Sequence, residues 1–324
     1  MKVSEYKYKV CTLCFTFNHA PYIEDAMNGF VMQETTFPVI TIIVDDASTD
    51  GEPEEIRNYL AEHFKLPYRT EETEYAHIIC AKHKTNDNCE FVVFLLKYNH
   101  YSIKKSKFPY LSEWLDNAKY HALCEGDDYW INPNKLQFQI DYLEGHSECG
   151  LVHARAKIFN QQEQRFRGCC GDNVIQFSDI IIRNPVVTLT TCFRASLFKE
   201  YMKCKTSWAT SDWKMGDYPL WIWLSHCSEV HFLNEEVAVY RELDYSMSHV
   251  KKIEDKIAFI ESTKEIQLFF ADLFLLEEEI KKKIQYNADF KCAIACYQFK
   301  ERKVARPYLK RLTFKDKWRI MLMR

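Results

Sequence analysis

The chain has 324 residues, of which 47% are apolar and 27% charged, so it can bury at least one large hydrophobic core. Its formal net charge of −3 gives no overall attraction to nucleic acid, and we expect no nucleic-acid partner. Only 8 residues are glycine, and neither G-x-G-x-x-G nor G-x-x-x-x-G-K-[ST] occurs. The two common glycine-rich phosphate-binding loops are therefore excluded.

Thirteen cysteines are spread along the whole chain, many of them inside apolar runs. No charged-then-apolar leader opens the sequence, so we expect a reducing, cytoplasmic location. Cys11 and Cys14 have the spacing of a zinc or redox pair, but they fall in a predicted strand, where residues three apart point to opposite faces. We therefore expect core packing there rather than metal binding. No run approaches the ~18 apolar residues of a membrane span.

The first half of the chain alternates apolar strand patterns with helical patterns. Strands are predicted, in chain order, at Val10–Phe17, Val39–Val44, Phe91–Leu96 and Tyr120–Cys124. Helices are predicted after Ala20-Pro21, from Pro53, over Leu111–Ala118 and from Pro133. This alternation predicts a mainly parallel sheet with helices on both faces. In such sheets, ligands bind beyond the carboxyl ends of the strands.

After residue 150 the pattern becomes mixed, and from residue 251 onward it is helical only. Further strands are predicted near Leu151–Phe159, at Val187–Phe193 and as two short segments within 229–241. Further helices are predicted after Ser178 and over Tyr218–His226. We therefore predict one domain of residues 1–250 and a helical C-terminal extension of residues 251–324.

Two acidic pairs follow predicted strands. Asp45-Asp46 ends the second strand and Asp127-Asp128 follows the fourth, so both pairs should open into one crevice. Their charges would repel each other unless a cation or the donors of a ligand lay between them. Carboxylate oxygens at a strand end suit Mg²⁺ or Mn²⁺ together with substrate phosphates. A turn or a helix cap is the alternative explanation of each pair.

Five stretches stand in a fixed order along the chain: TFNH at 16–19 followed by YI at 22–23, VDDASTD at 44–50, CEGDDYW at 124–130, GDYPLW at 216–221 and VYR at 239–241. In this order they resemble motifs of the inverting family-2 glycosyltransferases of the GT-A fold, especially the bacterial group used in surface-polysaccharide assembly. The resemblance covers residues 8 to about 250. It implies an α/β, Rossmann-like GT-A fold, a nucleotide-sugar donor and a Mn²⁺ or Mg²⁺ cofactor.

The resemblance also implies roles for single residues. Asp46 would accept a hydrogen bond from the nucleotide base, and Phe17 lies in the segment that lines the base, without the hydroxyl of the tyrosine usual there. Asp127 would meet the ribose or the sugar, and Asp128 would ligate the divalent metal. Asp217 would be the general base.

The family's basic residue on the phosphate side has no clear counterpart in this sequence. Lys104, Lys105 and Lys107 lie in the corresponding interval, and we select Lys105 as the candidate, with a solvated loop as the alternative. His249 is a candidate for a late metal ligand of the kind some relatives use, with a surface histidine as the alternative.

The expected chemistry agrees with these implied roles. Displacing a nucleoside diphosphate from a sugar builds negative charge on the departing phosphate, which a metal held by Asp128 would neutralise. Asp217 follows a glycine and opens a predicted helix, where its carboxylate can take the proton of the acceptor hydroxyl; a helix N-cap is the alternative. Trp130 and Trp221 flank the proposed site and are candidates for stacking on the acceptor sugar, with core packing as the alternative.

The C-terminal tail is strongly basic. Residues 301–324 hold nine Lys or Arg residues and two acidic ones, a net charge of +7, which leaves −10 for the rest of the chain. Together with its aromatic and aliphatic residues, this charge suits an anionic membrane surface, where lipid-linked acceptors are found. A helix docked on the acidic body is the alternative.

We therefore predict a metal-dependent, inverting glycosyltransferase of cell-envelope polysaccharide biosynthesis. It would move a sugar from a nucleotide-sugar donor, with a UDP-sugar as first choice, to a hydroxyl of a glycan or a lipid-linked acceptor. Two alternatives use the same crevice: a nucleotidyltransferase, and a non-catalytic module that binds sugar nucleotides. The presence of Asp217 argues against the non-catalytic module.

Overall fold

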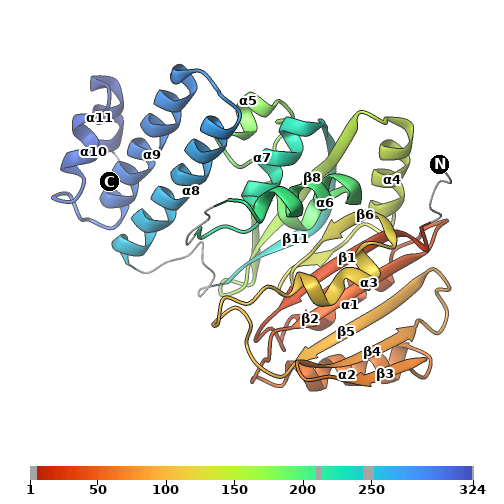
Figure 1. Ribbon diagram of the computed structural model, residues 1–324. Coiled ribbons are helices and arrows are strands. Elements are labelled where there is room, and N and C mark those ends of the chain that lie inside the picture. The colour runs from red at the N-terminus through yellow and green to blue at the C-terminus, as the bar shows by residue number, and fades with distance from the viewer. Residues whose placement is uncertain (1–5, 209–212, 244–251, 323–324) are drawn as a thin grey trace. The chain divides into compact units, whose positions relative to one another are not determined.

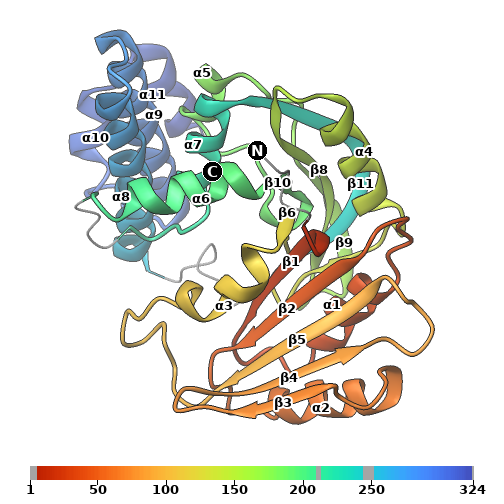
Figure 2. The same cartoon turned by 45° about the vertical axis from the view of Figure 1, so that its right-hand side comes forward.

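The computed structural model describes residues 6–208, 213–243 and 252–322 (Figures 1 and 2). The chain divides into two compact units. The N-terminal unit takes in residues 1–173, 186–202 and 227–242, and the C-terminal unit takes in residues 174–185, 203–226 and 243–324. The predicted domain boundary at residue 250 stays a prediction.

One sheet runs through the N-terminal unit. Its strands are β1 (Tyr8–Thr16), β2 (Val39–Asp45), β3 (Arg69–Glu72), β4 (Ala76–Lys82), β5 (Cys89–Leu96), β6 (Ala118–Leu123), β7 (Tyr129–Trp130), β8 (Cys149–Asn160), β9 (Arg165–Cys170), β10 (Cys192–Arg194) and β11 (Glu229–Glu242). Within the described residues their order is β3-β4-β5-β2-β1-β6-β10-β8-β11-β7, and β9 pairs with β8. Strands β5, β2, β1 and β6 run parallel, as do β8 and β11, whereas β4, β10 and β7 pair antiparallel. The predicted mixed, mainly parallel sheet is confirmed.

Helices cover both faces of this sheet, so its central strands are continuous apolar runs. On one face α1 (Ile23–Val31), α2 (Glu52–His63) and α4 (Lys135–Gly145) pack in the same cluster as Cys14. On the other face α3 (Phe108–Leu115) packs in the same cluster as Cys11 (Figure 2). The two cysteines are therefore buried on opposite faces, which confirms the prediction of core packing.

The carboxyl ends of the central strands place both acidic pairs at one edge of the sheet. Thr16 at the end of β1 lies opposite Asp45 of β2, and Leu13 of β1 lies opposite Leu123 at the end of β6. Because β1 lies between β2 and β6, the Asp45-Asp46 pair and the Asp127-Asp128 pair leave the sheet on either side of β1.

Several elements after residue 170 differ from the prediction. The strand predicted at Val187–Phe193 is mostly a turn, η1 (Thr188–Thr190), followed by the short β10. The Thr190 hydroxyl donates to the Val187 carbonyl oxygen at 2.7 Å, so a side chain satisfies the backbone and closes the turn. The two strands predicted within 229–241 are one strand, β11, with register shifts between Leu233 and Ala238 that let it bend. The helix predicted after Ser178 is only α5 (Phe177–Ile180).

Helices build the C-terminal unit, as predicted from residue 251 onward. They include α7 (Tyr218–Cys227), α8 (Ile253–Leu273), α9 (Glu278–Gln298), α10 (Arg306–Lys310) and α11 (Phe314–Met321), while α6 (Ala195–Lys205) spans the division between the two units. Helices α8 and α9 lie side by side (Figures 1 and 2), and Ile253, Ile260, Cys292 and Cys296 belong to their common core. Among the described residues, no helix combines the length and the apolar content needed to cross a bilayer.

Candidate functional site

A buried carboxylate ties together the loops that follow β1 and β2. Glu52 begins α2, and its Oε2 accepts hydrogen bonds from the His19 backbone N–H at 2.9 Å and from Ser48 Oγ at 2.8 Å. Its Oε1 accepts the Thr16 hydroxyl. Sequence reasoning missed Glu52, although a glutamate three residues after Thr49 at a helix start has the spacing of a capping box.

The turn after β2 has a left-handed residue that is not glycine. Ala47 has a φ of 63°, a conformation that favours glycine because a Cβ atom crowds the backbone there. The carboxylate of Asp45 receives the Ser48 N–H at 3.3 Å, and burial raises the pKa of Asp45 to about 6. Asp45 therefore stabilises the turn in which it lies, whereas Asp46 contacts the loop that follows β5.

Asp46 orders the loop that follows β5. Its Oδ1 accepts the His100 backbone N–H at 2.7 Å, and its Oδ2 accepts the Tyr101 backbone N–H at 3.1 Å. Lys107 Nζ lies 2.7 Å from Oδ2 and pairs with this buried carboxylate. Lys107, one of the three candidate lysines, therefore contacts a predicted site residue.

Lys105 has different surroundings. Its Nζ donates to the Tyr98 hydroxyl at 2.9 Å and lies over the rings of Tyr98 and Tyr110, 5.2 and 5.7 Å from their centroids. A phosphate contact by Lys105 stays a prediction. Phe17, directly after β1, is exposed, so its ring has an accessible face at this edge of the sheet.

Three carboxylates gather at the end of β6. Glu125, Asp127 and Asp128 each offer an oxygen, and these oxygens lie within 4.8 Å of one another. Asp127 Oδ1 is buried and, in the part of the chain that the structure describes, accepts no hydrogen bond. Burial and repulsion from Asp127 raise the pKa of Asp128 well above its usual range. Carboxylate oxygens that lie this close together and repel one another, with Asp127 Oδ1 still able to accept, fit a hard divalent cation such as Mg²⁺ or Mn²⁺.

Arg241, near the end of β11, fixes this acidic turn. Its backbone N–H donates to Asp128 Oδ1 at 2.8 Å, and its Nε donates to the Asp127 carbonyl oxygen at 2.8 Å. The guanidinium also donates to Gln161 Oε1 at 2.8 Å and pairs with Asp25 Oδ2 at 2.7 Å. The motif containing Arg241 was noted in the sequence, but its position beside the acidic turn was not predicted.

His19 lies between the β1 loop and the acidic turn. Its Nδ1 is 3.1 Å from Thr16 Oγ1, and its Nε2 is 3.9 Å from Asp127 Oδ2. Because the Thr16 hydroxyl donates its proton to Glu52, we assign the Nδ1 proton to His19, with Thr16 as acceptor. Glu52, Thr16, His19 and Asp127 therefore form one chain of polar contacts along this edge.

Gly126 permits the acidic turn to approach β1. A Cβ atom at this position would lie 2.1 Å from Thr16 Oγ1 and 2.6 Å from Thr16 Cβ. Any side chain would therefore displace Thr16 and the contacts that Thr16 makes with Glu52 and His19.

The prediction that Trp130 and Trp221 stack on an acceptor sugar is wrong. Both side chains are buried, so neither ring has a face open to a ligand. Trp130 Nε1 donates to the Leu189 carbonyl oxygen at 2.7 Å, and its ring packs against Phe30 and under Lys135 Nζ. Core packing, the alternative in each case, is what the structure shows.

Asp217 belongs to the C-terminal unit, directly before α7. Its half-buried side chain accepts the Tyr218 N–H at 2.7 Å, while its carbonyl oxygen accepts the N–H of Leu220 at 2.9 Å. The Tyr218 hydroxyl donates to the Ile180 carbonyl oxygen at 2.8 Å and holds the start of the helix in place. The predicted helix start is confirmed, and the role of Asp217 as base stays a prediction. His249 lies outside the described residues.

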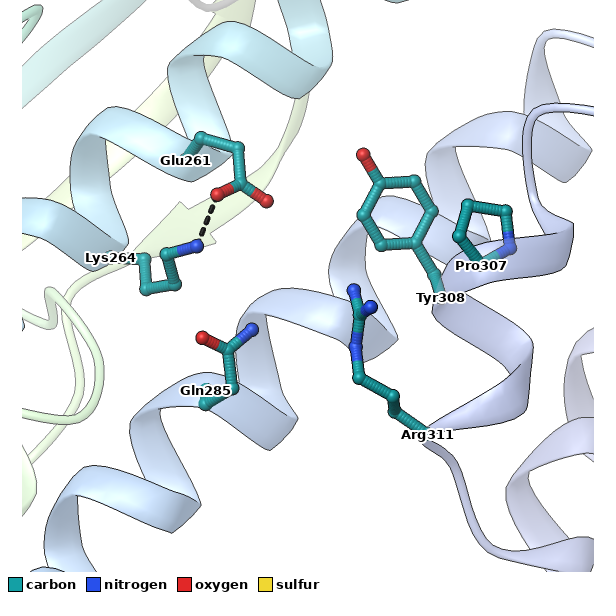
Figure 3. A pocket seen from close by; sticks show the side chains of 6 residues that line it. All are labelled: Glu261, Lys264, Gln285, Pro307, Tyr308 and Arg311. Atoms are coloured by element: carbon teal, nitrogen blue, oxygen red, sulfur yellow. Dashed lines mark hydrogen bonds and ion pairs between the residues drawn. The ribbon is translucent and has the colours of Figure 1, made fainter.

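A cavity of about 500 Å³ lies within the C-terminal unit (Figure 3). Its lining consists of Glu261, Lys264, Gln285, Pro307, Tyr308 and Arg311. Lys264 pairs with Glu261, and Arg311 Nε donates to Asp289 Oδ2 at 2.7 Å. None of the predicted site residues that the structure describes lines this cavity, and carboxylates of the same unit already pair with its cations.

No family model matches the chain. An uncharacterized protein of Mycobacterium tuberculosis H37Rv (Rv1520) and one of Mycobacterium bovis (Mb1547) are each 26% identical to it over 239 residues. These matches cover 72% of this chain and 59% of each relative. The chain thus spans about three fifths of the length of these relatives.

Two solved structures share the fold. The mannosyltransferase PcManGT of Pyrobaculum calidifontis, in complex with GDP-Man and Mn²⁺, matches with a TM-score of 0.52 and 13% identity over 98% of this chain and 79% of that protein. S. aureus TarS matches with a TM-score of 0.51 and 14% identity over 96% of this chain and 54% of TarS. At such low identity the likeness shows the fold alone, and the predicted GT-A-type α/β fold is confirmed.

Proposed function

We propose that the chain is a glycosyltransferase that moves a sugar from a nucleotide-sugar donor to an acceptor hydroxyl. The observation that carries this proposal is the cluster of Glu125, Asp127 and Asp128 at the carboxyl edge of a GT-A-type sheet. Hard cations at such clusters also hold substrate phosphates. The complex of the mannosyltransferase with GDP-Man and Mn²⁺ supports the same class of donor. Our first choice of donor is a UDP-sugar.

In this proposal Asp128 ligates Mn²⁺ or Mg²⁺, and Asp127 meets the ribose or the sugar. A divalent cation, when bound, neutralises the charge that develops on the departing diphosphate. Asp46 accepts a hydrogen bond from the base, for which Oδ1 has a lone pair beyond the one that His100 occupies. Phe17 lines the base with its exposed ring. Lys105 is the candidate on the phosphate side.

Asp217 is the proposed general base. A carboxylate at a helix start can take the proton of the acceptor hydroxyl as that oxygen attacks the sugar. Because one base and one displacement suffice, we propose inversion at the anomeric carbon. This assignment rests on the resemblance of residues 216–221 to the family's base segment.

The proposed acceptor is a glycan or a lipid-linked molecule of envelope polysaccharide synthesis. We place the enzyme in the cytoplasm, peripheral at the inner face of the membrane, because residues 301–324 carry a net charge of +7.

The test is the identity of the released product. The purified chain is incubated with Mn²⁺ and each of a panel of UDP-sugars and GDP-sugars, and both nucleotides and pyrophosphate are quantified. We expect slow release of the nucleoside diphosphate from one donor without acceptor and faster release with the acceptor. Release of pyrophosphate would establish a nucleotidyltransferase instead, and donor binding without turnover in the presence of acceptor would establish a binding module.

A further inference from the structure

Helix α11 has one side packed against the protein and one side without cover. Ile320 is buried in a cluster with Ala293 of α9, and α11 lies beside α9 (Figure 1). On the other side, large apolar side chains are exposed: Phe314 by 75%, Trp318 by 51%, Met321 by 47% and Leu322 by 70%.

These four residues form one stripe. At about 100° of rotation per residue, positions 314, 318, 321 and 322 fall within an arc of about 100° on the helix surface. The ring centroids of Phe314 and Trp318 lie 6.1 Å apart, so the two aromatic side chains are neighbours. Contiguous exposed apolar surface of this kind marks an interaction site.

Basic side chains flank the stripe on both sides. By the same rotation, Lys317 falls on one border of the stripe and Lys315 on the other, and Arg319 lies further round the helix on the Lys315 side, over the ring of Phe290. The only acidic residue of α11, Asp316, points away from the stripe and accepts hydrogen bonds from Tyr286 and Thr313. Within residues 301–322, cations that form no ion pair to another described residue are Arg302, Lys303, Arg306, Lys310, Lys315, Lys317 and Arg319.

We propose that the α11 stripe of Phe314, Trp318, Met321 and Leu322 binds the surface of an anionic lipid bilayer. Aromatic and aliphatic side chains enter the boundary between headgroups and acyl chains, while flanking lysine and arginine side chains reach the lipid phosphates. A second copy of the chain is a less favourable partner for the stripe than lipid, because two sets of cations without ion-pair partners would then repel each other. The inference extends the membrane location in the proposed function, but binding to lipid does not depend on the transfer chemistry.

The experiment measures sedimentation of the full chain with lipid vesicles at low and high salt. The vesicles contain phosphatidylcholine with or without phosphatidylglycerol. We expect binding only to the phosphatidylglycerol vesicles and only at low salt, since salt screens the attraction. Replacing Phe314→Ala together with Trp318→Ala should weaken binding at least about tenfold. Leu66→Ala, at a 93% exposed leucine of the N-terminal unit, is the matched control and should bind like the parent.

A second measurement locates the indole. Brominated lipid should quench part of the tryptophan fluorescence of the parent, and Trp318→Phe should remove that part. The inference is overturned if the parent ignores anionic vesicles at low salt, if the double variant binds as well as the parent, or if the stripe instead mediates self-association without lipid. Binding of the donor with Mn²⁺, measured in the same proteins, should stay unchanged. If the parent does not bind the donor, that result would count against the proposed function but would not affect the conclusion about lipid binding.

Discussion

Arg241 holds Asp128 through a backbone group: its N–H donates to Asp128 Oδ1 at 2.8 Å. The guanidinium of the same residue donates to the carbonyl oxygen of Asp127, so β11 fixes the acidic turn at two successive residues. Gln161 and Asp25 each accept a hydrogen bond from one of the two terminal nitrogens of the buried guanidinium. The acidic turn is therefore positioned by a strand that is 113 residues later in the sequence.

We expect Arg241→Lys to weaken the binding of UDP in the presence of Mn²⁺. Lysine keeps the backbone N–H and the charge, but its single ammonium cannot serve three acceptors in the planar arrangement of a guanidinium. Stability should also fall by about 1–3 kcal/mol, because the hydrogen bonds of the guanidinium to Asp127 and Gln161 are lost. Calorimetric titration and urea denaturation measure the two effects. The control is Arg165→Lys on the exposed strand β9, and an unchanged UDP affinity in Arg241→Lys would refute the positioning role.

Asp128→Asn should reduce the Mn²⁺-dependent affinity for a nucleoside diphosphate at least about tenfold, with the fold intact. The amide keeps the size and one oxygen but loses the charge that a hard cation requires. Asp87→Asn, on an exposed side chain that pairs with Lys65 at 3.6 Å, is the matched control. Equal affinities in Asp128→Asn and the parent would remove Asp128 from the metal site.

Gly126→Ala should destabilise the protein by about 2 kcal/mol or more, since its methyl group would overlap Thr16. Gly145→Ala, at the end of α4, is the control because a Cβ atom there meets nothing within 4 Å. The control should be neutral or slightly stabilising, as alanine favours helix. Urea denaturation measures the stability of both variants. Equal denaturation midpoints for Gly126→Ala and the parent would show that a methyl group at position 126 does not overlap Thr16.

Stability should depend on pH through Lys135, whose pKa burial lowers to about 8. Between pH 8 and the ordinary pKa of 10.5, the unfolded chain binds a proton that the folded chain has released, so stability rises with pH in this window. Between these two pH values, the free energy of unfolding of the parent should rise by up to about 3 kcal/mol relative to that of Lys135→Met. Chemical denaturation at several pH values measures the difference, with Lys65→Met as the exposed control. If the difference in the free energy of unfolding between the parent and Lys135→Met does not change with pH, the pKa of Lys135 is not lowered by folding.

Asp217→Asn should keep donor and metal binding but lower transfer by about 10²–10⁴-fold, because only the proton acceptor is removed. The amide has nearly the size of the carboxylate, so the buried Tyr218 and Trp221 should stay packed. Transfer rate and donor affinity are measured separately, and the product's anomeric configuration is determined by NMR. A retained configuration, or a variant as fast as the parent, would exclude Asp217 as an inverting base.

The central strands could be predicted because burial on both faces leaves a continuous apolar run in the sequence. Every residue of β2 and of β5 is buried, and both were located within two residues. The hairpin of β3 and β4 was missed since β3, with the sequence RTEE, lies at the edge of the sheet and has no apolar pattern. The burial of Trp130 could not be predicted either, because an aromatic residue next to a polar motif has the same sequence pattern whether it is buried or exposed.

The acidic pairs could be predicted because each lies where a strand ends: Asp45 is the last residue of β2, and Asp127 comes four residues after the end of β6. The long-range contacts of Glu52 and Arg241 could not be predicted: Glu52 binds residues 33 and 36 positions away, and Arg241 binds Asp25 from 216 positions away. Such contacts depend on how strands are ordered in the sheet, and no local pattern encodes that order.

The shared acceptor Glu52 has a consequence for motion at this edge of the sheet. If the loop after β1 moved outward, His19 would lose its hydrogen bond to Glu52, and if the loop after β2 moved outward, Ser48 would lose its own. Thr49, in the loop after β2, also donates its N–H to Asn18 in the loop after β1, so a direct hydrogen bond joins the two loops. Neither loop can open alone without breaking contacts of both. We therefore expect them to fluctuate as a single cooperative unit, in which the amide hydrogens of His19 and Thr49 exchange with solvent through one common opening.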